Sequence, residues 1–427
     1  MKLKAQLVIV IALLVSLMTP AFASNDAMKD LLKVLRDNGT ISEDAYSVLS
    51  NSVHADAEKS SAHQAESDEN MVAKIAAATE KMKWAEKIKL KGDLRLRRQY
   101  SDVSDDDASD PESRVRYRYR FRLGATGQVN DQFKVGAGFA SGGADSRSTN
   151  ETLDDNFSTK DTRLDYAFVQ YTPVDYATIV AGKFKRKDYL WAPTDLLWDG
   201  DINPEGMSVK FKNKSSAGET YLSGGVWILD ESGSSKDDPM MSYAQLGHKF
   251  KSGNMFGNVA GTIYRFKDVE DNGLLDNAEG TNTQVAGNYA GDFDSFGLSG
   301  EFGTTAVMGG KMFSVFGDYI KNSDNDEDTG YAVGFKFGDK KVSNRHQWQF
   351  KYIYADLERD AWLDIFPDSD RFGGLTGVKG NEFVLKYGLH KNVVFAVDYY
   401  DSEMDISGFA DDNDKEKILQ TDLIFKF

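Results

Sequence analysis

One short stretch of the chain alternates arginine with apolar residues. The arginines, which we call the arginine ladder, are Arg114, Arg116, Arg118, Arg120 and Arg122, and they alternate with Val115, Tyr117, Tyr119, Phe121 and Leu123. Alternate side chains of a β-strand point to the same face, so all five guanidinium groups would share one face. A guanidinium group binds carboxylate or phosphate through two parallel hydrogen bonds. The spacing therefore predicts a surface that attracts anions.

A second cationic row precedes the arginine ladder. Lys89, Lys91, Arg95 and Arg97 alternate with Ile88, Leu90, Leu94 and Leu96, and Asp93 is the one acid among them. If the two segments are neighbouring strands, they present nine cations and one anion to the same wall. Such a wall raises the local concentration of anions at the mouth of a channel.

The strand that carries the ladder must keep it away from lipid. An arginine on the lipid face of a membrane barrel costs about 2 to 4 kcal/mol at the bilayer midplane, and five such costs exceed what a marginally stable fold tolerates. The ladder must then line a barrel lumen. From Arg114 to Arg122 a strand covers about 27 Å, which is similar to the apolar band of a barrel, about 25 Å tall.

A loop rich in acids supplies possible partners for the ladder. We expect a constriction loop that contains Asp195, Trp198, Asp199, Asp201 and Glu205. If it folds inward, its acids oppose the arginines and the charge preference is modest; if it stays outside, strong anion selectivity follows. The arginines can also pair internally and only pack the barrel, because a bare cationic row repels itself. For the loop, anchoring to the wall and Ca²⁺ binding are further alternatives.

The first residues predict export. Lys2 and Lys4 precede an apolar run from Leu7 to Met18, and the run 21–23 fits a small-x-small cleavage site. We expect a signal peptide over 1–23, whose removal changes the formal net charge from -16 to -18.

The last residues predict a membrane strand. One face carries Leu419, Thr421, Leu423, Phe425 and Phe427, and the other carries Gln420, Asp422 and Lys426. This period of two with a terminal aromatic resembles the signal by which the barrel assembly machinery selects outer-membrane proteins, and we assign that role to Phe425 and Phe427.

Composition excludes several other classes of protein. The chain has no cysteine and 7 prolines, but 38 glycines, 26 phenylalanines and 19 tyrosines. No apolar run of about 18 residues follows the signal, so no membrane helix is expected there. The remaining way to cross a membrane is a closed barrel. No glycine pattern forms a phosphate loop, and we predict no cofactor, no metal site and no nucleic-acid partner.

Residues 24–86 predict a periplasmic helical segment. Met28, Leu31, Leu32 and Leu35 form a helical stripe that ends at 38–39, Ser42 can cap a second short helix, and 54–67 reads as loose. A short coiled-coil seam follows at Met71, Ile75, Ala78, Met82 and Ala85. A trimer-forming or wall-contacting stalk and an amphipathic leader are both consistent with this pattern.

Residues 87–427 predict the barrel. We expect an all-β transmembrane barrel of sixteen antiparallel strands, at 87–100, 113–126, 132–141, 162–172, 176–186, 206–212, 219–229, 241–250, 255–267, 292–302, 311–320, 330–338, 346–355, 380–389, 393–401 and 417–427. Short and long connections alternate, as in bacterial barrels with short periplasmic turns and long external loops. Acids crowd the first and last long loops, where they are either solvated or bridged by divalent cations to lipopolysaccharide.

Several motifs carry a family resemblance. One motif resembles that of the putative porins and consists of Gly182-Lys183-Phe184 and the run from Leu197 to Gly206. A second resemblance covers the stretch from Ser148 to Leu153 with Phe157, Ser158 and Lys160. The arginine ladder is similar to that of the same family as well. The resemblance implies an outer-membrane channel and a homotrimer, and little about the solute. Long arginine ladders are also similar to those of phosphate-selective porins, although no lysine cluster is visible in the sequence.

We therefore expect a water-filled porin for small hydrophilic solutes that prefers anions. Two other classes are possible. A barrel enzyme would need a nucleophile, a base and an orienting group, but the five histidines do not fall near such a set. A structural tether of the envelope would use the helical segment but would leave the ladder unexplained.

Overall fold

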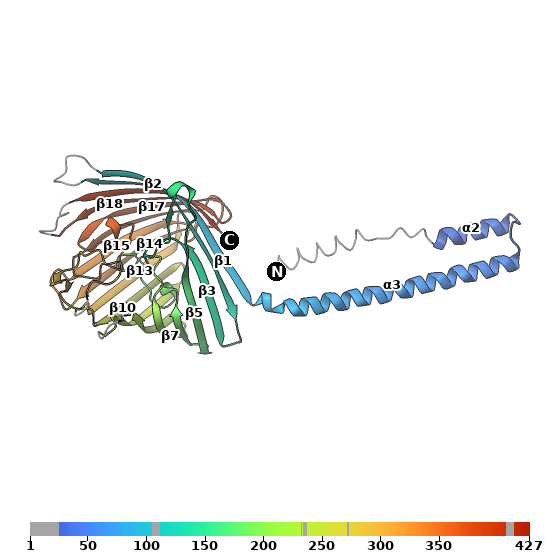
Figure 1. The fold of residues 1–427 in the computed structure, drawn as a ribbon, viewed down its shortest axis with the longest axis horizontal. Coiled ribbons are helices and arrows are strands. Elements are labelled where there is room, and N and C mark those ends of the chain that lie inside the picture. The colour runs from blue at the N-terminus through green and yellow to red at the C-terminus, as the bar shows by residue number, and fades with distance from the viewer. Residues whose placement is uncertain (1–24, 105–111, 232, 234–236, 271–272, 407–413) are drawn as a thin grey trace. The chain divides into compact units, whose positions relative to one another are not determined.

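The computed structural model describes residues 25–104, 112–231, 233, 237–270, 273–406 and 414–427 (Figure 1). The chain divides into two compact units that meet between Glu86 and Lys87, and each is described by itself. The signal peptide expected over 1–23 lies outside the described residues.

The N-terminal unit is a helical hairpin of α2 (Asn25–Asp37) and α3 (Glu43–Glu86). Gly39 has a φ of 71°, which suits the residue that ends a helix. The Ser42 hydroxyl accepts a hydrogen bond from the Ala45 N–H and caps α3. The Arg36 guanidinium lies 4.5 Å from the ring centre of Tyr46 and joins the two helices. Among the described residues, no helix is long and apolar enough to cross a membrane.

Two expectations for this unit are wrong. The helix after Ser42, expected to be short, is the 44-residue α3, and residues 54–67, expected to be loose, lie within it. The segment is polar, but it has no glycine or proline, and four alanines, two glutamates, one lysine and one glutamine, all strong helix formers, make up eight of its fourteen residues. Helix propensity therefore outweighs the missing apolar stripe.

The second unit is a closed antiparallel barrel (Figure 1). Its sixteen strands are β1 (Ile88–Ser104), β2 (Glu112–Gln128), β3 (Phe133–Ser141), β5 (Thr162–Val174), β6 (Ala177–Lys183), β7 (Glu205–Ser215), β8 (Gly218–Ile228), β9 (Met240–Ser252), β10 (Met255–Lys267), β13 (Ser295–Val307), β14 (Lys311–Asn322), β15 (Thr329–Gly338), β16 (Trp348–Leu357), β17 (Val378–His390), β18 (Val393–Met404) and β19 (Lys415–Lys426). The short pairs β4 (Glu151–Thr152), β11 (Gln284–Val285) and β12 (Asn288–Tyr289) and the 3-10 turns η1 (Asp155–Phe157), η2 (Arg186–Asp188) and η3 (Phe372–Gly374) lie in loops.

The predicted barrel of sixteen strands is confirmed. The last strand closes it by pairing with the first, from Asp93 opposite Lys426 to Ser104 opposite Lys415. The connections alternate between short turns and long loops, apart from a nine-residue turn at 339–347 and a six-residue loop at 323–328. Strand β6 stops at Lys183, earlier than expected: the Phe184 N–H makes one further bond to the Pro204 carbonyl, and the chain then turns into the 3-10 turn Arg186–Asp188.

The two faces of the wall differ in chemistry. On β2, Val115, Tyr117 and Phe121 are exposed on the outer face, whereas the arginines between Arg116 and Arg122 are partly buried on the inner face. This alternation is the usual pattern of a membrane barrel with a polar interior.

Three long loops pack into one hydrophobic core with the barrel wall. They are the third loop (184–204), the fifth loop (268–294) and the seventh loop (358–377). The N–H of Trp191 bonds to Gln245 on β9, and Thr194 bonds to Asp318 on β14, so the third loop contacts inner residues of two distant strands. The Trp362 indole N–H donates to the Leu197 carbonyl at 2.8 Å and joins the seventh loop to the third.

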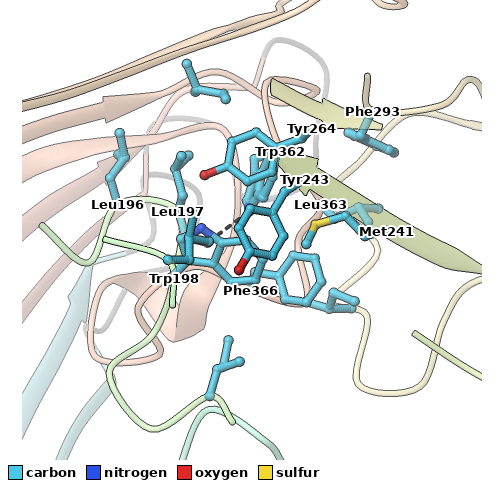
Figure 2. Packing of buried hydrophobic residues seen from close by; sticks show 14 of the residues in the cluster. Leu196, Leu197, Trp198, Met241, Tyr243, Tyr264, Phe293, Trp362, Leu363 and Phe366 are labelled. Atoms are coloured by element: carbon cyan, nitrogen blue, oxygen red, sulfur yellow. Dashed lines mark hydrogen bonds between the residues drawn. The ribbon is translucent and has the colours of Figure 1, made fainter. Parts of the chain in front are cut away.

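An aromatic core fills this side of the lumen (Figure 2). Trp198 and Trp362 are fully buried with ring centres 5.4 Å apart. Trp227 and Tyr264 of the wall pack against them, and Tyr243 packs against Trp227. Protein interiors of this kind are close-packed and exclude water, so the region beside β8, β9 and β10 is closed to solutes.

Replacing Trp198 by alanine should weaken the packing of the loops inside the barrel. Loss of a buried tryptophan costs about 3 to 5 kcal/mol, and thermal unfolding of the detergent-solubilised protein should show a lower Tm. Phe302→Ala is the matched control, because Phe302 is 47% exposed on the outer face. An equal loss of Tm in both variants would contradict a stabilising core in the lumen.

Candidate pore wall and basic cavity

The strand register sets arginines beside one another. On β1 and β2, Arg95 lies opposite Arg120, and Arg97 lies opposite Arg118. Like charges directly opposite each other destabilise a strand pair. The arrangement is therefore stable only if carboxylates or an aqueous environment compensate the charges.

Arg97 has two carboxylate partners. Its Nε and Nη2 donate to Asp422 of β19 at 2.8 and 3.0 Å, and its Nη1 donates to Asp370 of the seventh loop at 3.0 Å. The Arg97 side chain is only 3% exposed. Asp422 also lies 3.6 Å from Nη1 of Arg95. The Nη2 of Arg95 donates a hydrogen bond to the side-chain oxygen of Asn150.

Arg120 and Arg122 share two further carboxylates. Asp93 of β1 accepts from Arg120 at 2.8 Å and from Arg122 at 2.9 Å. Asp201 of the third loop accepts from Arg122 at 2.9 Å and lies 3.8 Å from Nη1 of Arg120. Arg95, Arg97, Arg120 and Arg122 together with the carboxylates Asp93, Asp201, Asp370 and Asp422 form a network that we call the Arg–Asp lock.

The upper ladder, toward the long loops, is different. The Nε atoms of Arg116 and Arg118 are buried and have no hydrogen-bond partner among the residues that the structure describes. Arg114, at the end of the ladder, is exposed. The ladder is therefore compensated by carboxylates at Arg120 and Arg122, and its upper guanidinium groups are left to water or to a solute.

The expected constriction loop lies inside the barrel, but its residues have different roles. Asp201 alone among its acids bonds to the ladder. Asp199 accepts from Ser369 of the seventh loop at 3.0 Å, and Trp198 belongs to the aromatic core. Asp195 interacts with Arg186 of its own loop. Glu205 pairs with Lys183 at 2.7 Å at an exposed position of the wall.

The partners Asp370 and Asp422 were not identified from the sequence. Asp422 could have been found, because the alternation of the last strand assigns it to the inner face and a closed barrel places that strand beside β1. For Asp370 the sequence carries no signal, since it bonds to Arg97 from a long loop 273 positions away.

A basic cavity of about 670 Å³ lies below the ladder. It is at the short-turn end of the barrel, because its lining includes Ser343 and Asn392 from short turns. Its charged lining residues are Lys91, Arg95, Arg97, Arg120, Arg122, Lys341, Lys386 and Lys426, opposed by Asp93, Asp398 and Asp422. Lys89 is exposed and does not line it. The cavity brings together lysines that are far apart in the sequence.

The cavity and the aromatic core occupy different sides of the barrel. The core packs against β6, β8 to β10 and β14 to β16. The cavity is lined by β1, β2 and β17 to β19, together with short turns. This cavity in the described part of the lumen therefore lies beside the arginines.

The described residues show no metal-binding cluster. They contain no cluster of three or more histidine or acidic side chains suited to a metal ion. Asp199, Asp201 and Glu205, considered above as Ca²⁺ ligands, each bond to a different partner. Of the barrel histidines, His248 contacts Thr220 and His346 contacts Tyr387.

Two loop carboxyls have opposite pKa shifts. Burial would raise the pKa of Asp201, but the charges of Arg120 and Arg122 outweigh it and lower that pKa to about 2. Burial and the nearby charge of Asp370 raise the pKa of Asp368 to about 7. Asp201 is therefore ionised over the neutral range, and Asp368 titrates within it.

The packing of the seventh loop should weaken as pH rises from about 4 to 7. An unfolded aspartate has a pKa of about 3.9, so the packed loop binds the Asp368 proton more tightly than the open loop does. The stability that this proton gives to the packed loop is lost as the pH rises toward the pKa of Asp368 in the folded protein. Hydrogen exchange of amides in 358–377, corrected for intrinsic rates, measures the opening free energy. Asp368→Asn should show a smaller pH slope, and an unchanged slope would contradict this assignment.

Comparison with known proteins agrees with this fold. The model of the family described as putative porin matches residues 108–301 and 304–427. The high-pH structure of OprB from Pseudomonas putida aligns with a TM-score of 0.55 and 13% identity, covering 80% of this chain and 95% of that one. A triple mutant of the Rhodopseudomonas blastica porin aligns with a TM-score of 0.43 and 12% identity, covering 80% of this chain and all of that one. No curated protein matches the chain. Because the family model covers most of a chain that folds as a sixteen-stranded barrel, the protein belongs to the putative porin family of outer-membrane channels.

Proposed function

We propose that this porin is a diffusion channel for small hydrophilic solutes with a weak to moderate preference for anions. The observation that carries the proposal is the position of the basic cavity beside the arginine ladder, on the side of the lumen that the aromatic core leaves open. A solute that moves along this side stays close to guanidinium and ammonium groups, which favour anions in low-dielectric surroundings.

The preference is moderate because the Arg–Asp lock compensates part of the wall. Four carboxylates face Arg95, Arg97, Arg120 and Arg122. Cations that form no salt bridge among the described residues lie on both sides of the lock, at Arg116 and Arg118 above it and at Lys341, Lys386 and Lys426 below it, although Asp398 and Glu382 lie near Lys386. An anion that enters from either end therefore first meets cationic side chains that form no ion pair with a carboxylate.

We also propose the route by which the chain reaches the membrane. Residues 1–23 act as a signal peptide, residues 24–86 remain in the periplasm, and the barrel assembly machinery recognises the end of β19 at Phe425 and Phe427. The pairing of Phe427 with Gly92 supports this role, because the terminal residue takes part in closing the barrel. Three copies form a homotrimer, with lipid and lipopolysaccharide around it.

Replacing Arg116, Arg118 and Arg120 by glutamine should reduce anion preference, because the wall loses three positive charges. The measurement is the zero-current potential of the purified protein in a planar bilayer under a KCl gradient. Among single variants, Arg98→Gln is the matched control for Arg118→Gln, because Arg98 is exposed on the opposite face of β1. A triple variant with the wild-type potential would refute the role of the ladder.

The mature protein should begin at Ser24. Edman sequencing or mass spectrometry of protein purified from outer membranes measures its N-terminus directly. Replacing Ala21 and Ala23 by arginine should leave the signal uncleaved, because the cleavage site requires small residues. An N-terminus at Met1 in the wild-type protein would contradict the assignment.

A further inference from the structure

We propose that the Arg–Asp lock is a binding site for short dicarboxylates, which Asp201 and Asp370 occupy in the solute-free channel. The proposal rests on the proposed anion channel and names a class of solute for it. Asp201 belongs to the third loop and Asp370 to the seventh, and each places one carboxylate on the guanidinium groups of the barrel wall. These two side chains are therefore already bound as a pair of carboxylates.

The spacing of the arginines suits two linked carboxylates. Arg97, which holds Asp370, lies on β1, and Arg120, which lies near Asp201, is its diagonal neighbour on β2, since Arg95 is directly opposite Arg120. Diagonal neighbours on adjacent strands are about 7 to 8 Å apart. Both positions are thus within reach of one short aliphatic chain with a carboxylate at each end.

A solute in the basic cavity lies beside these arginines. Arg95, Arg97, Arg120 and Arg122 all line the basic cavity, and Lys386 and Lys426 line it with them. The volume of about 670 Å³ exceeds that of a four-carbon diacid. The cavity therefore collects the anion beside the guanidinium groups to which it would bind.

The four carboxylates of the lock differ in how easily they can leave. Asp93 and Asp422 lie on β1 and β19 and are held by the strand ladder itself. Asp201 and Asp370 lie on loops and can withdraw without breaking the barrel. Exchanging one carboxylate for another preserves the charge-assisted hydrogen bonds of each arginine, whereas removing a carboxylate without replacement leaves a buried charge unpaired, which is costly.

Displacement of Asp370 would also affect the joint between the loops. Ser369, its chain neighbour, donates to Asp199 of the third loop through both its N–H and its hydroxyl, each at 3.0 Å. Withdrawal of Asp370 from Arg97 therefore pulls on the contact that connects the two loops. Dicarboxylate binding should make the residues of this joint more accessible.

The first experiment measures block of the chloride current through the wild-type channel in planar bilayers. Succinate should reduce the current at concentrations where acetate, at equal ionic strength, leaves it nearly unchanged, because acetate can replace only one loop carboxylate. Asp370→Asn should lower the half-blocking concentration of succinate about tenfold, the factor that corresponds to about 1.4 kcal/mol, because the competing carboxylate is removed.

Asp422→Asn is the matched control for charge. It removes one carboxylate from the same arginine, but from the wall instead of the loop, so Asp370 still competes and the half-blocking concentration should fall less. Equal shifts in Asp370→Asn and Asp422→Asn, or equal block by acetate and succinate, would overturn the proposal.

A labelling experiment tests the movement of the loop. Because the chain has no cysteine, Ser369→Cys introduces a single thiol. Maleimide should label this thiol faster in succinate than in chloride at equal ionic strength, and an unchanged rate would overturn displacement. If the wild-type channel shows no chloride preference in its zero-current potential, the proposed function fails; if that preference is present but succinate acts like acetate, only the dicarboxylate site fails.

Discussion

The interior of this barrel depends on ion pairs between arginines of the wall and aspartates of the loops. A buried guanidinium without a partner costs several kcal/mol, and Arg97 is almost fully buried. Its partners come from the wall, at Asp422, and from the seventh loop, at Asp370. The arginines of the wall therefore also determine where the loops attach, through Arg97 with Asp370 and Arg122 with Asp201.

The lumen has a dry side and a charged side. Aromatic and aliphatic side chains from three loops and seven strands form one core, with Trp198 at its centre (Figure 2). The arginines, the basic cavity and the acids of the lock lie along the remaining strands. The cavity in the described part of the lumen therefore lies off-centre, beside one wall.

The sequence predicted the barrel well and the contacts inside it poorly. All sixteen strands were expected from period-two alternation, and the inward face of the ladder followed from the cost of placing arginine in lipid. The acid-rich loop offered four carboxylates as candidate partners of the ladder, but only Asp201 among them bonds to it. Residues 54–67 were expected to be loose, because polarity was given more weight than the helix propensity of their alanines and glutamates.

Local physics explains which features the sequence by itself determined. Alternation of side chains is a property of a single strand, so the number of strands, their two faces and the closing strand are all encoded in neighbouring residues. The pairing of Arg97 with Asp370 and Asp422 spans 273 and 325 positions, and the lysines of the cavity come from separate strands and turns. Only the closed barrel and the inward path of its loops decided these contacts, because each depends on register and loop packing that no single segment specifies.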